Sequence, residues 1–222
     1  MTINISHDIN SNLFVKNPSD TELGRKIVGK GLQLVHKLGI ENFNFKKLAE
    51  NINTTEASVY RYFKDKHQFV LYLNAWYWRY ILFLVEFELK SEQKPIDKLN
   101  TVLSILYNKQ KFKFKSEILD ILLLRELMLS ESVRLIYTQN IESINKQNLL
   151  SDQIKYLEIV KDIIKNINPK IKFPLAIATT MVESIQIQHH LISHGLPLTD
   201  IPSNESKYIS NYLESFFIHN IE

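Results

Sequence analysis

Residues 44–66 constrain the fold most, because they predict two short helices joined by a tight turn. Asn44 belongs to the residue types that cap helices by accepting from backbone N–H groups two or three positions later. The apolar residues that follow recur at helical spacing on one face. They are Phe45, Leu48, Ala49 and Ile52. The pattern predicts a first helix of about two turns.

A tight turn and a second helix come next in the chain. Asn53 tolerates the left-handed backbone conformation that ends a helix. Either Thr54 or Thr55 is positioned to cap a new helix that begins at Glu56. The stretch therefore predicts a helix, a tight turn and a second helix.

The second helix, residues 56–63, separates apolar from polar side chains. Val59 and Phe63 are four residues apart, so we expect both to pack inward. The positions expected to face outward are Glu56, Ser58, Tyr60, Arg61 and Tyr62. This helix is therefore predicted to display a polar, aromatic and cationic face.

A third helix is predicted to begin immediately afterwards. Asp65 and Gln68 have the spacing of a capping box, which places Lys66 in the first turn. A cation gains nothing from the helix dipole there, since that end already carries partial positive charge. A phosphate outside the protein would interact with the helix N–H groups and the ammonium together. Lys66 thus indicates an anionic partner.

The order and spacing of these residues resemble the N-terminal domain of the TetR/AcrR family of bacterial transcriptional regulators, over roughly residues 20–72. The matching positions are Gly39-Ile40, Phe45, Leu48-Ala49, Thr55, Tyr60-x-Tyr62-Phe63 and Lys66. The resemblance implies that residues 56–63 form a recognition helix in the major groove of double-stranded operator DNA.

The resemblance also implies individual DNA contacts. The positions nearest base edges would be Glu56, Ala57, Ser58 and Arg61. Lys46 would reach a base or a phosphate. The contacts to the DNA backbone would come from Asn44, Thr55, Tyr60, Tyr62 and Lys66.

Two residues depart from the family pattern. Asn53 stands where the family usually has Gly, a modest change because Asn also adopts left-handed backbone angles. Glu56 stands where a neutral or basic residue is common. A carboxylate near phosphates weakens electrostatic affinity, but it can accept from cytosine N4. We therefore expect Glu56 to influence the choice of base.

Composition and charge agree with a helical nucleic-acid-binding protein. The 222 residues include only five Gly and six Pro, which favours an all-α fold over a turn-rich β fold. Residues 1–70 hold ten Lys/Arg and seven Asp/Glu, whereas residues 71–222 hold seventeen of each. The net charge of +3 thus lies in the N-terminal part. An excess of this size is also ordinary on a solvated surface, so the motif rather than the charge indicates DNA.

Several other classes of function have no sequence support. Cysteine is absent, so disulfides and cysteine metal sites are excluded, in agreement with a cytoplasmic location. The N-terminus lacks a basic segment followed by an apolar run, so no secretory signal is expected. No P-loop, dinucleotide-binding glycine pattern, Gly-x-Ser-x-Gly or HExxH motif occurs. We therefore expect no enzyme activity, cofactor or metal.

Three regions are predicted along the chain. Residues 1–18 form a flexible arm that ends at Asn17-Pro18, with Lys16 as its only cation for a minor-groove contact. Residues 19–65 form the DNA-binding head, whose first helix begins with a capping box at Ser19 and ends at Gly39. Residues 66–222 form a helical body for effector binding and dimerisation.

The body begins with an almost uniformly apolar helix, residues 65–90. A membrane span is the alternative for such a helix, but Arg79 and Glu86 interrupt it, so a buried core helix is predicted. Candidates to line an effector pocket are Trp76, Trp78, Tyr80, Phe83, Tyr107, Arg125, Glu126 and Gln186. Ordinary core packing remains the alternative for the aromatic residues, and an outward or ion-paired position for Arg125-Glu126.

Further helices are predicted over residues 117–129, 130–148 and 152–167. The lysine run Lys109–Lys115 predicts a solvated loop, with a nucleic-acid or membrane contact as the alternative. The last two long helices, residues 174–194 and 206–218, resemble the pair that joins two subunits in the family.

His190 and His194 have metal-ligand spacing, but the nearest carboxylate on that face, Glu183, lies about two turns earlier, so a surface or interface pair is expected. The complete prediction is a homodimeric transcriptional regulator, a repressor released from a palindromic operator by a small apolar or aromatic effector. The alternative is a helical protein-interaction or lipid-carrier module without a role in DNA regulation.

Overall fold

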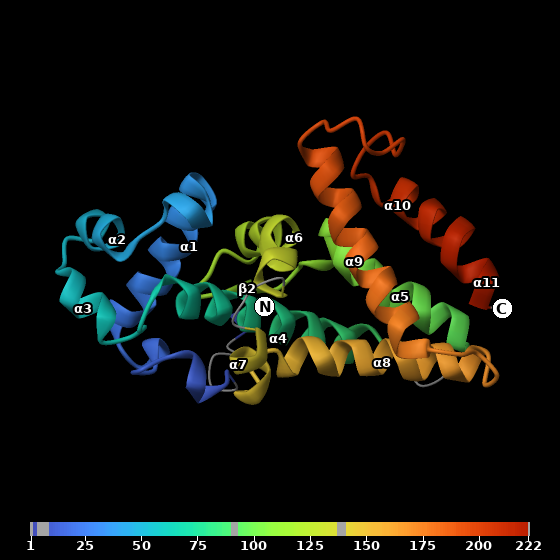
Figure 1. Ribbon diagram of the computed structural model, residues 1–222, viewed down its shortest axis with the longest axis horizontal. Coiled ribbons are helices and arrows are strands. Elements are labelled where there is room, and N and C mark those ends of the chain that lie inside the picture. Colours follow the sequence, from blue (N-terminus) through green and yellow to red (C-terminus); the bar gives the residue numbers. More distant parts are fainter. Residues whose placement is uncertain (1, 4–8, 90–92, 137–140, 222) are drawn as a thin grey trace. The chain divides into compact units, whose positions relative to one another are not determined.

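The computed structural model describes residues 2–3, 9–89, 93–136 and 141–221 (Figure 1). The described chain is helical almost throughout, so the predicted all-α class is confirmed. Within these residues the strands are β1 (Thr2–Ile3) and β2 (Lys115–Ser116), two residues each, which pair in parallel.

The chain divides into two compact units. The first contains residues 1–79, 113–128 and 134–151, and the second contains residues 80–112, 129–133 and 152–222. The head predicted over residues 19–65 lies within the first unit.

Helices of the first unit form the head and its support. Its elements are α1 (Glu22–Asn42), α2 (Phe45–Asn51), α3 (Glu56–Tyr60), most of α4 (Lys66–Glu88), the start of α6 (Ile121–Ile136) and α7 (Ile141–Lys146). Two single 3-10 turns precede them, Ser11–Leu13 and Pro18–Asp20. The α1–α3 segment is coloured blue to cyan in Figure 1.

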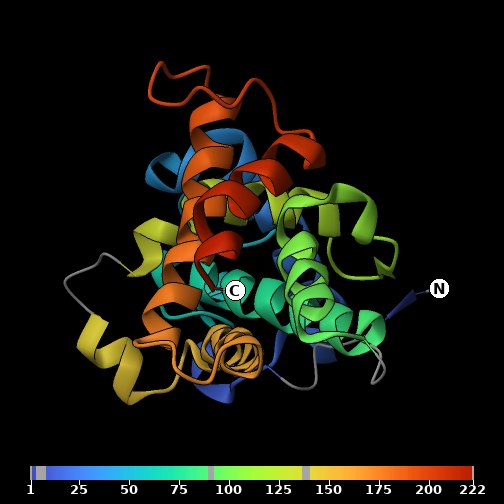
Figure 2. The ribbon, with the colours of Figure 1, turned by 90° about the vertical axis from the view of Figure 1, so that its right-hand side faces the viewer.

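The second unit consists mainly of four helices. They are α5 (Pro95–Tyr107), α8 (Ser151–Ile167), α9 (Pro174–Ser193) and α10 (Ser206–Leu213). A 3-10 turn at Lys109–Lys111, a π-helical turn at Glu214–Ile218 and the short α11 (His219–Ile221) complete it. Helix α5 packs against both α9 and α10, and Figure 2 shows these three helices side by side.

A close approach between α1 and α4 holds the core of the first unit together. A Cβ atom added at Gly31 would lie 2.4 Å from Cζ of Phe69, so only glycine fits at this position. The Phe69 ring is fully buried and packs edge to face on Phe63, with 5.1 Å between the ring centroids. Phe43 stacks on the same ring at 5.5 Å. The apolar residues predicted to pack inward from the second helix, Val59 and Phe63, are both fully buried.

The ends of the first helix differ from the prediction. Thr21 rather than Ser19 caps α1, because the Thr21 hydroxyl accepts from the backbone N–H of Gly24 at 3.0 Å. Ser19 lies two residues before Thr21, in the 3-10 turn Pro18–Asp20. At Gly39 the helix kinks, with φ of 75°, and then continues to Asn42. The predicted capping box at Ser19 and the stop at Gly39 are therefore corrected.

The described part of the N-terminal arm packs on the first unit. Leu13 is fully buried, and the backbone N–H of Val15 donates to the carbonyl oxygen of Tyr62 at 2.8 Å. The side-chain amide of Asn10 donates to the carbonyl oxygens of Gln147 and Asn148, at 3.1 Å each. The prediction of a flexible arm is thus wrong for residues 9–18, because these residues have long-range partners. Residues 1 and 4–8 lie outside the described residues.

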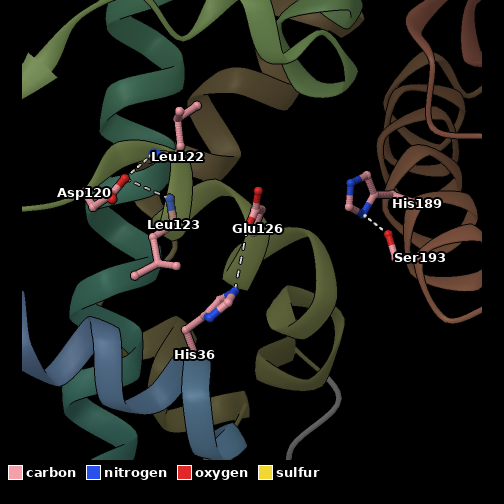
Figure 3. Close-up of polar contacts among 7 residues, drawn as sticks. All are labelled: His36, Asp120, Leu122, Leu123, Glu126, His189 and Ser193. Carbon is pink, nitrogen blue, oxygen red and sulfur yellow. Dashed lines mark hydrogen bonds and ion pairs between the residues drawn. The ribbon is translucent and has the colours of Figure 1, made fainter.

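The body helices largely follow the predicted periodicity. Helices α4, α8 and α9 match predicted helices to within two residues at each end. The helix predicted from residue 117 begins instead at Ile121, because the Asp120 carboxylate accepts from the N–H groups of Leu122 and Leu123 (Figure 3). The helix predicted over residues 130–148 is divided between α6 and α7, and residues 137–140 lie outside the described residues.

The remaining differences concern the last helix and the lysine run. The helix predicted over residues 206–218 ends as α10 at Leu213 and passes into the π-helical turn. In the lysine run, Phe112 and Phe114 are buried, whereas Lys109 and Lys113 are exposed. None of the described helices is long and apolar enough to cross a membrane.

Candidate nucleic-acid interface

Local hydrogen bonds build the helix-turn-helix as predicted. The Asn44 side chain caps α2 by accepting from the backbone N–H of Lys47 at 2.9 Å. Asn53 has a φ of 55°, so it supplies the left-handed residue between the helices. The Thr55 hydroxyl caps α3 by accepting from the backbone N–H of Ser58 at 3.2 Å.

The second helix is shorter than predicted, and one of its residues points inward. Helix α3 ends at Tyr60, and the N–H groups of Tyr62 and Phe63 both donate to the carbonyl oxygen of Val59. Tyr62 has an exposed fraction of only 4%. Its phenol shares a 2.7 Å hydrogen bond with the Thr21 hydroxyl. The predicted outward orientation of Tyr62 is therefore wrong, because the residue that caps α1 provides a long-range partner for its hydroxyl.

An exposed face remains on α3 beside the turn. Glu56, Tyr60 and Arg61 are exposed, as predicted, and Ala57 is exposed as well. The exposed fraction of Tyr60 is 48%, and its ring packs edge to face on the buried Phe45 with 5.1 Å between centroids. The contact with Phe45 thus fixes the Tyr60 ring, so that the Tyr60 hydroxyl has a defined position on the surface.

Ser58 and Glu56 both have roles within the protein. Ser58 is half-buried, and its hydroxyl oxygen lies 2.9 Å from that of Thr55, so the two hydroxyls share a hydrogen bond. Glu56 is in the first turn of α3, where the positive end of the helix dipole stabilises a carboxylate. An acidic residue at position 56 therefore has two explanations, the stability of α3 and the choice of base.

Three lysines in the head or directly after it donate to backbone carbonyl groups near helix ends. Lys26 donates to Ile52 at 3.1 Å, Lys47 to Asn42 at 2.8 Å, and Lys66 to Ile40 and Glu41 at 3.1 Å each. Cations are favoured at the negative end of a helix. Lys66 thus has a structural partner that the sequence did not indicate, at the end of α1.

Three further exposed cations lie on or next to the helix-turn-helix. Within the described residues, the side chains of Lys46, Arg61 and Lys64 take part in no hydrogen bond or ion pair. Lys46 and Arg61 were among the predicted DNA contacts. Lys64 was not among the predicted DNA contacts. Its position between the buried Phe63 and the start of α4 could have indicated an exposed cation next to the helix-turn-helix.

The predicted effector residues divide between the two units. In the first unit, Trp76 and Trp78 are fully buried and Arg125 is 4% exposed. Burial lowers the pKa of Arg125. The outward position considered for Arg125 is therefore wrong. Glu126 is partly exposed, and its carboxylate lies 3.6 Å from Nε2 of His36 on α1 (Figure 3).

In the second unit, Tyr80 is buried and stacks on Phe112, with 5.4 Å between the ring centroids. Phe83 and Tyr107 are half-buried, and burial raises the pKa of Tyr107. Gln186 is only 1% exposed. Neither its amide nitrogen nor its amide oxygen has a hydrogen-bond partner among the residues that the structure describes.

The two histidines with metal-ligand spacing contact each other. The ring centroids of His190 and His194 are 4.3 Å apart, and Nδ1 of His194 lies 2.9 Å from the carbonyl oxygen of His190. Within the described ranges, no group of three or more His, Asp or Glu side chains has a geometry that could hold a metal ion.

Comparison with known proteins identifies the head. The family model for bacterial regulatory proteins of the tetR family matches residues 27–73. These residues contain α2, the turn, α3 and the start of α4. Comparison of the sequence with curated proteins gave no significant match.

The fold of the chain is similar to that of AibR. A crystal structure of AibR in complex with isovaleryl coenzyme A and operator DNA matches with a TM-score of 0.57 and 10% sequence identity, covering 85% of this chain and 95% of AibR. Apo AibR matches with a TM-score of 0.48 and 11% identity, covering 85% and 94%. The capped helix-turn-helix and the match over it show that residues 27–73 form a head similar to that of bacterial regulatory proteins of the tetR family, and the fold of the chain is similar to that of AibR.

Proposed function

We propose that the protein is a homodimeric transcriptional repressor that binds a palindromic operator and leaves it when a small molecule binds. The observation that carries this proposal is the exposed face of α3, which follows the turn formed by Asn53 and Thr55 and ends with the exposed residues Tyr60 and Arg61. A protein that works on chromosomal DNA belongs in the cytoplasm. No observation favours a protein-interaction or lipid-carrier module.

The contacts to DNA fall into two groups. Base edges are read by Glu56 and Ala57, which are exposed on α3, and by Arg61, which is exposed directly after it. The half-buried Ser58 also contacts base edges. The backbone phosphates are bound by Asn44, Thr55, Tyr60 and Lys66, to which we add Lys46 and Lys64. Tyr62 is buried and makes no contact with DNA. Its hydrogen bond to Thr21 holds the end of α3 against the start of α1.

The dimer is formed by α9 and the segment from α10 to Ile218. The exposed apolar side chains Leu175 and Ile187 on α9, and Phe216 in the π-helical turn, support this assignment. Apolar residues at a symmetric interface would become buried when two subunits pair. A two-fold axis then gives two related half-sites in the operator.

The effector enters the helical body and acts by a shift in population. AibR was crystallised with an acyl coenzyme A and operator DNA, which supports a small-molecule effector for the related fold here. An effector releases the operator only by the difference between its affinities for the two conformations of the regulator. The predicted body residues, including Tyr107 and Gln186, are candidates for its polar contacts.

Selection from random double-stranded DNA provides the direct test. We expect the full-length protein to enrich a palindromic sequence, which is then used as the probe in fluorescence anisotropy. Arg61→Ala should cost about 1–3 kcal/mol and relax the preference at one base position of each half-site. Lys64→Ala should weaken binding to all sequences and lower the salt dependence by about one ion for each phosphate that is no longer neutralised.

Lys165→Ala is the matched control, because Lys165 is an exposed lysine at the end of α8. We expect it to leave both affinity and salt dependence unchanged. If no sequence is enriched, or if Arg61→Ala binds as the parent does while remaining folded, the assignment of α3 is refuted.

A further inference from the structure

The N-terminal arm, residues 9–18 of the described chain, contacts the first unit at two sites that are far apart in the sequence. The first site is the α7–α8 turn, residues 147–150, which connects these two helices. The second is the α3–α4 junction, residues 61–68, which ends in the first turn of α4. Both sites belong to the first unit, so the arm connects two parts of the same unit.

Asn10 attaches the arm to the α7–α8 turn. Its side-chain amide donates to the carbonyl oxygens of Gln147 and Asn148, at 3.1 Å each. Both carbonyl groups lie at the end of α7, where carbonyl groups lack a partner within the helix. Asn148 has the left-handed backbone conformation that ends many helices, with a φ of 54°. Asn10 therefore binds the point at which the backbone leaves α7.

Asn12, Val15 and Lys16 attach the arm to the α3–α4 junction. The carbonyl oxygen of Asn12 accepts from the side-chain amide of Gln68 at 2.9 Å. The backbone N–H of Val15 donates to the carbonyl oxygen of Tyr62 at 2.8 Å. The Lys16 ammonium lies 5.6 Å from the centroid of the Tyr62 ring, within the range of a cation–π interaction. The arm is thus bound both to the end of the helix-turn-helix and to the start of α4.

The short segment between the two attachments is ordered. Oδ1 of Asn10 accepts from the N–H of Asn12, and the carbonyl oxygen of Asn10 accepts from the N–H of Leu13, at 3.0 Å each. These bonds stabilise the 3-10 turn Ser11–Leu13. Ile9 is 6% exposed and Leu13 is fully buried, so apolar side chains anchor the arm on both sides of Asn10. A displacement of Asn10 therefore reaches Asn12 directly, because no flexible loop lies between them.

We propose that the N-terminal arm is a strap that couples the α7–α8 turn to the end of the helix-turn-helix. Asn10 binds the turn, Asn12 binds the α3–α4 junction, and a hydrogen bond joins the two asparagines. Proteins open locally in cooperative units, and contacts that share one short ordered segment are expected to open together. Release of the strap at either site should therefore loosen the other site as well.

The regulatory consequence of the strap rests on the proposed function. The α7–α8 turn leads into α8, most of which belongs to the second unit. A change of conformation that an effector causes in α8 reaches Tyr62 through the strap, in addition to any movement of α4. Coupling between two sites requires an element whose equilibrium both sites influence, and the strap is such an element.

Hydrogen exchange of the full-length protein without DNA tests the coupling, with peptides 9–16 and 144–151 as reporters. Asn10→Asp removes the two donated hydrogen bonds and keeps the acceptor for Asn12. We expect it to raise the exchange rates of both peptides about fivefold, the effect of losing one hydrogen bond. Asn42→Asp is the matched control, because the exposed Asn42 donates to Leu38 within its own helix. It should leave both peptides unchanged.

Gln68→Ala releases the strap at the α3–α4 junction, whereas peptide 144–151 reports on the other site. We expect this variant to raise exchange in peptide 144–151 severalfold in the parent and to add nothing in the Asn10→Asp background. The second background is needed because Gln68 also accepts from the N–H of Lys64. Gln33→Ala is the control, since the exposed Gln33 accepts from Lys30 within α1.

Thermal unfolding confirms that every variant is folded. Unchanged exchange of peptide 144–151 in Gln68→Ala, or the same increase in both backgrounds, overturns the strap.

The operator duplex obtained by selection tests the regulatory role. Coupling is reciprocal, so operator binding at the head should slow exchange in peptide 144–151 of the parent and leave it unchanged in Asn10→Asp. Slowing that persists in Asn10→Asp contradicts a regulatory role for the strap. If selection yields no operator, the proposed function fails, while the exchange rates without DNA still decide whether the strap couples the two sites.

Discussion

The phenolic oxygen of Tyr62 lies 2.7 Å from the hydroxyl oxygen of Thr21, 41 residues earlier in the chain. The same Thr21 hydroxyl caps α1 by accepting from Gly24. The carbonyl oxygen of Tyr62 accepts in turn from the N–H of Val15. Tyr62 therefore joins the end of the helix-turn-helix to the start of α1 and to the N-terminal arm.

Replacing Tyr62 by Phe should lower the stability of the head. We expect Tyr62→Phe to reduce the free energy of unfolding by about 1 kcal/mol, because one buried hydrogen bond is removed while the ring is kept. Urea unfolding followed by circular dichroism measures the change. Tyr60→Phe is the control, since the exposed Tyr60 hydroxyl should affect operator affinity and leave stability unchanged. The opposite pattern would assign the DNA contact to Tyr62.

The turn between α2 and α3 should depend on the backbone conformation of Asn53. Its φ of 55° is unfavourable for residues with a β-carbon other than Asn and Asp. Asn53→Ala should therefore destabilise the protein by about 1 kcal/mol, whereas Asn53→Gly should be neutral or stabilising. Thermal unfolding of the two variants side by side checks this. Equal melting temperatures for the Ala and Gly variants would contradict it.

Packing of α1 on α4 should fail when a methyl group is added at Gly31. The new Cβ would lie 2.4 Å from Cζ of the fully buried Phe69. We expect Gly31→Ala to cost about 1–3 kcal/mol through overpacking, although alanine favours helices. Chemical unfolding gives the value, with the exposed Lys37→Ala on the same helix as control.

A double-mutant cycle between Gly31 and Phe69 tests whether overpacking against the Phe69 ring is the cause. A smaller side chain at Phe69 removes the clash, so Gly31→Ala should cost less in a Phe69→Leu background than in the parent. Strictly additive costs of the two substitutions would show that the Phe69 ring is not the cause.

Stability should depend on pH through Glu183 of α9. Burial raises the pKa of Glu183 above its ordinary value of 4.5, so the folded state binds the proton more tightly than the unfolded state does. Its contribution is fully present below pH 4.5 and is lost as the pH rises through the folded-state pKa. Glu183→Gln should therefore raise the melting temperature at about pH 7.5, and the gain should shrink as the pH approaches 4.5.

Melting temperatures are compared at one protein concentration, because dimerisation alters apparent stability. The exposed Glu142→Gln on α7 is the control and should show no pH-dependent gain. A gain that is the same at both pH values would point to a cause other than the titration of Glu183.

The local design of the head was predictable from its residues. Asn44, Thr55 and Asp65 cap helices in the structure as their spacing indicates, and Asn53 takes the left-handed conformation. A cap links a side chain to a backbone N–H two or three residues later, so the neighbouring sequence contains both partners. The choice of Thr21 over Ser19 was missed, because both residues satisfy the same local rule.

The burial of the residues that were predicted to bind an effector could not be predicted from the sequence. The alternatives for Arg125 were an outward position, an ion pair or a ligand contact, and its burial between helices of the first unit was not visible in the periodicity of α6. Asn74 interrupts the apolar pattern of α4, and Tyr77 is one of its aromatic residues. The burial of their polar atoms without a hydrogen-bond partner among the described residues depends on packing between segments far apart in the chain.

The sequence by itself determined the helical class, the position of the helix-turn-helix and the family resemblance, because helix periodicity and capping depend on residues within about one turn of each other. Only the tertiary structure decided which polar side chains face inward. The partner of Tyr62 is 41 residues away, and the carbonyl groups that bind Lys66 are 25 and 26 residues away. Contacts over such separations form only when the helices pack, so the spacing of residues along the chain does not reveal them.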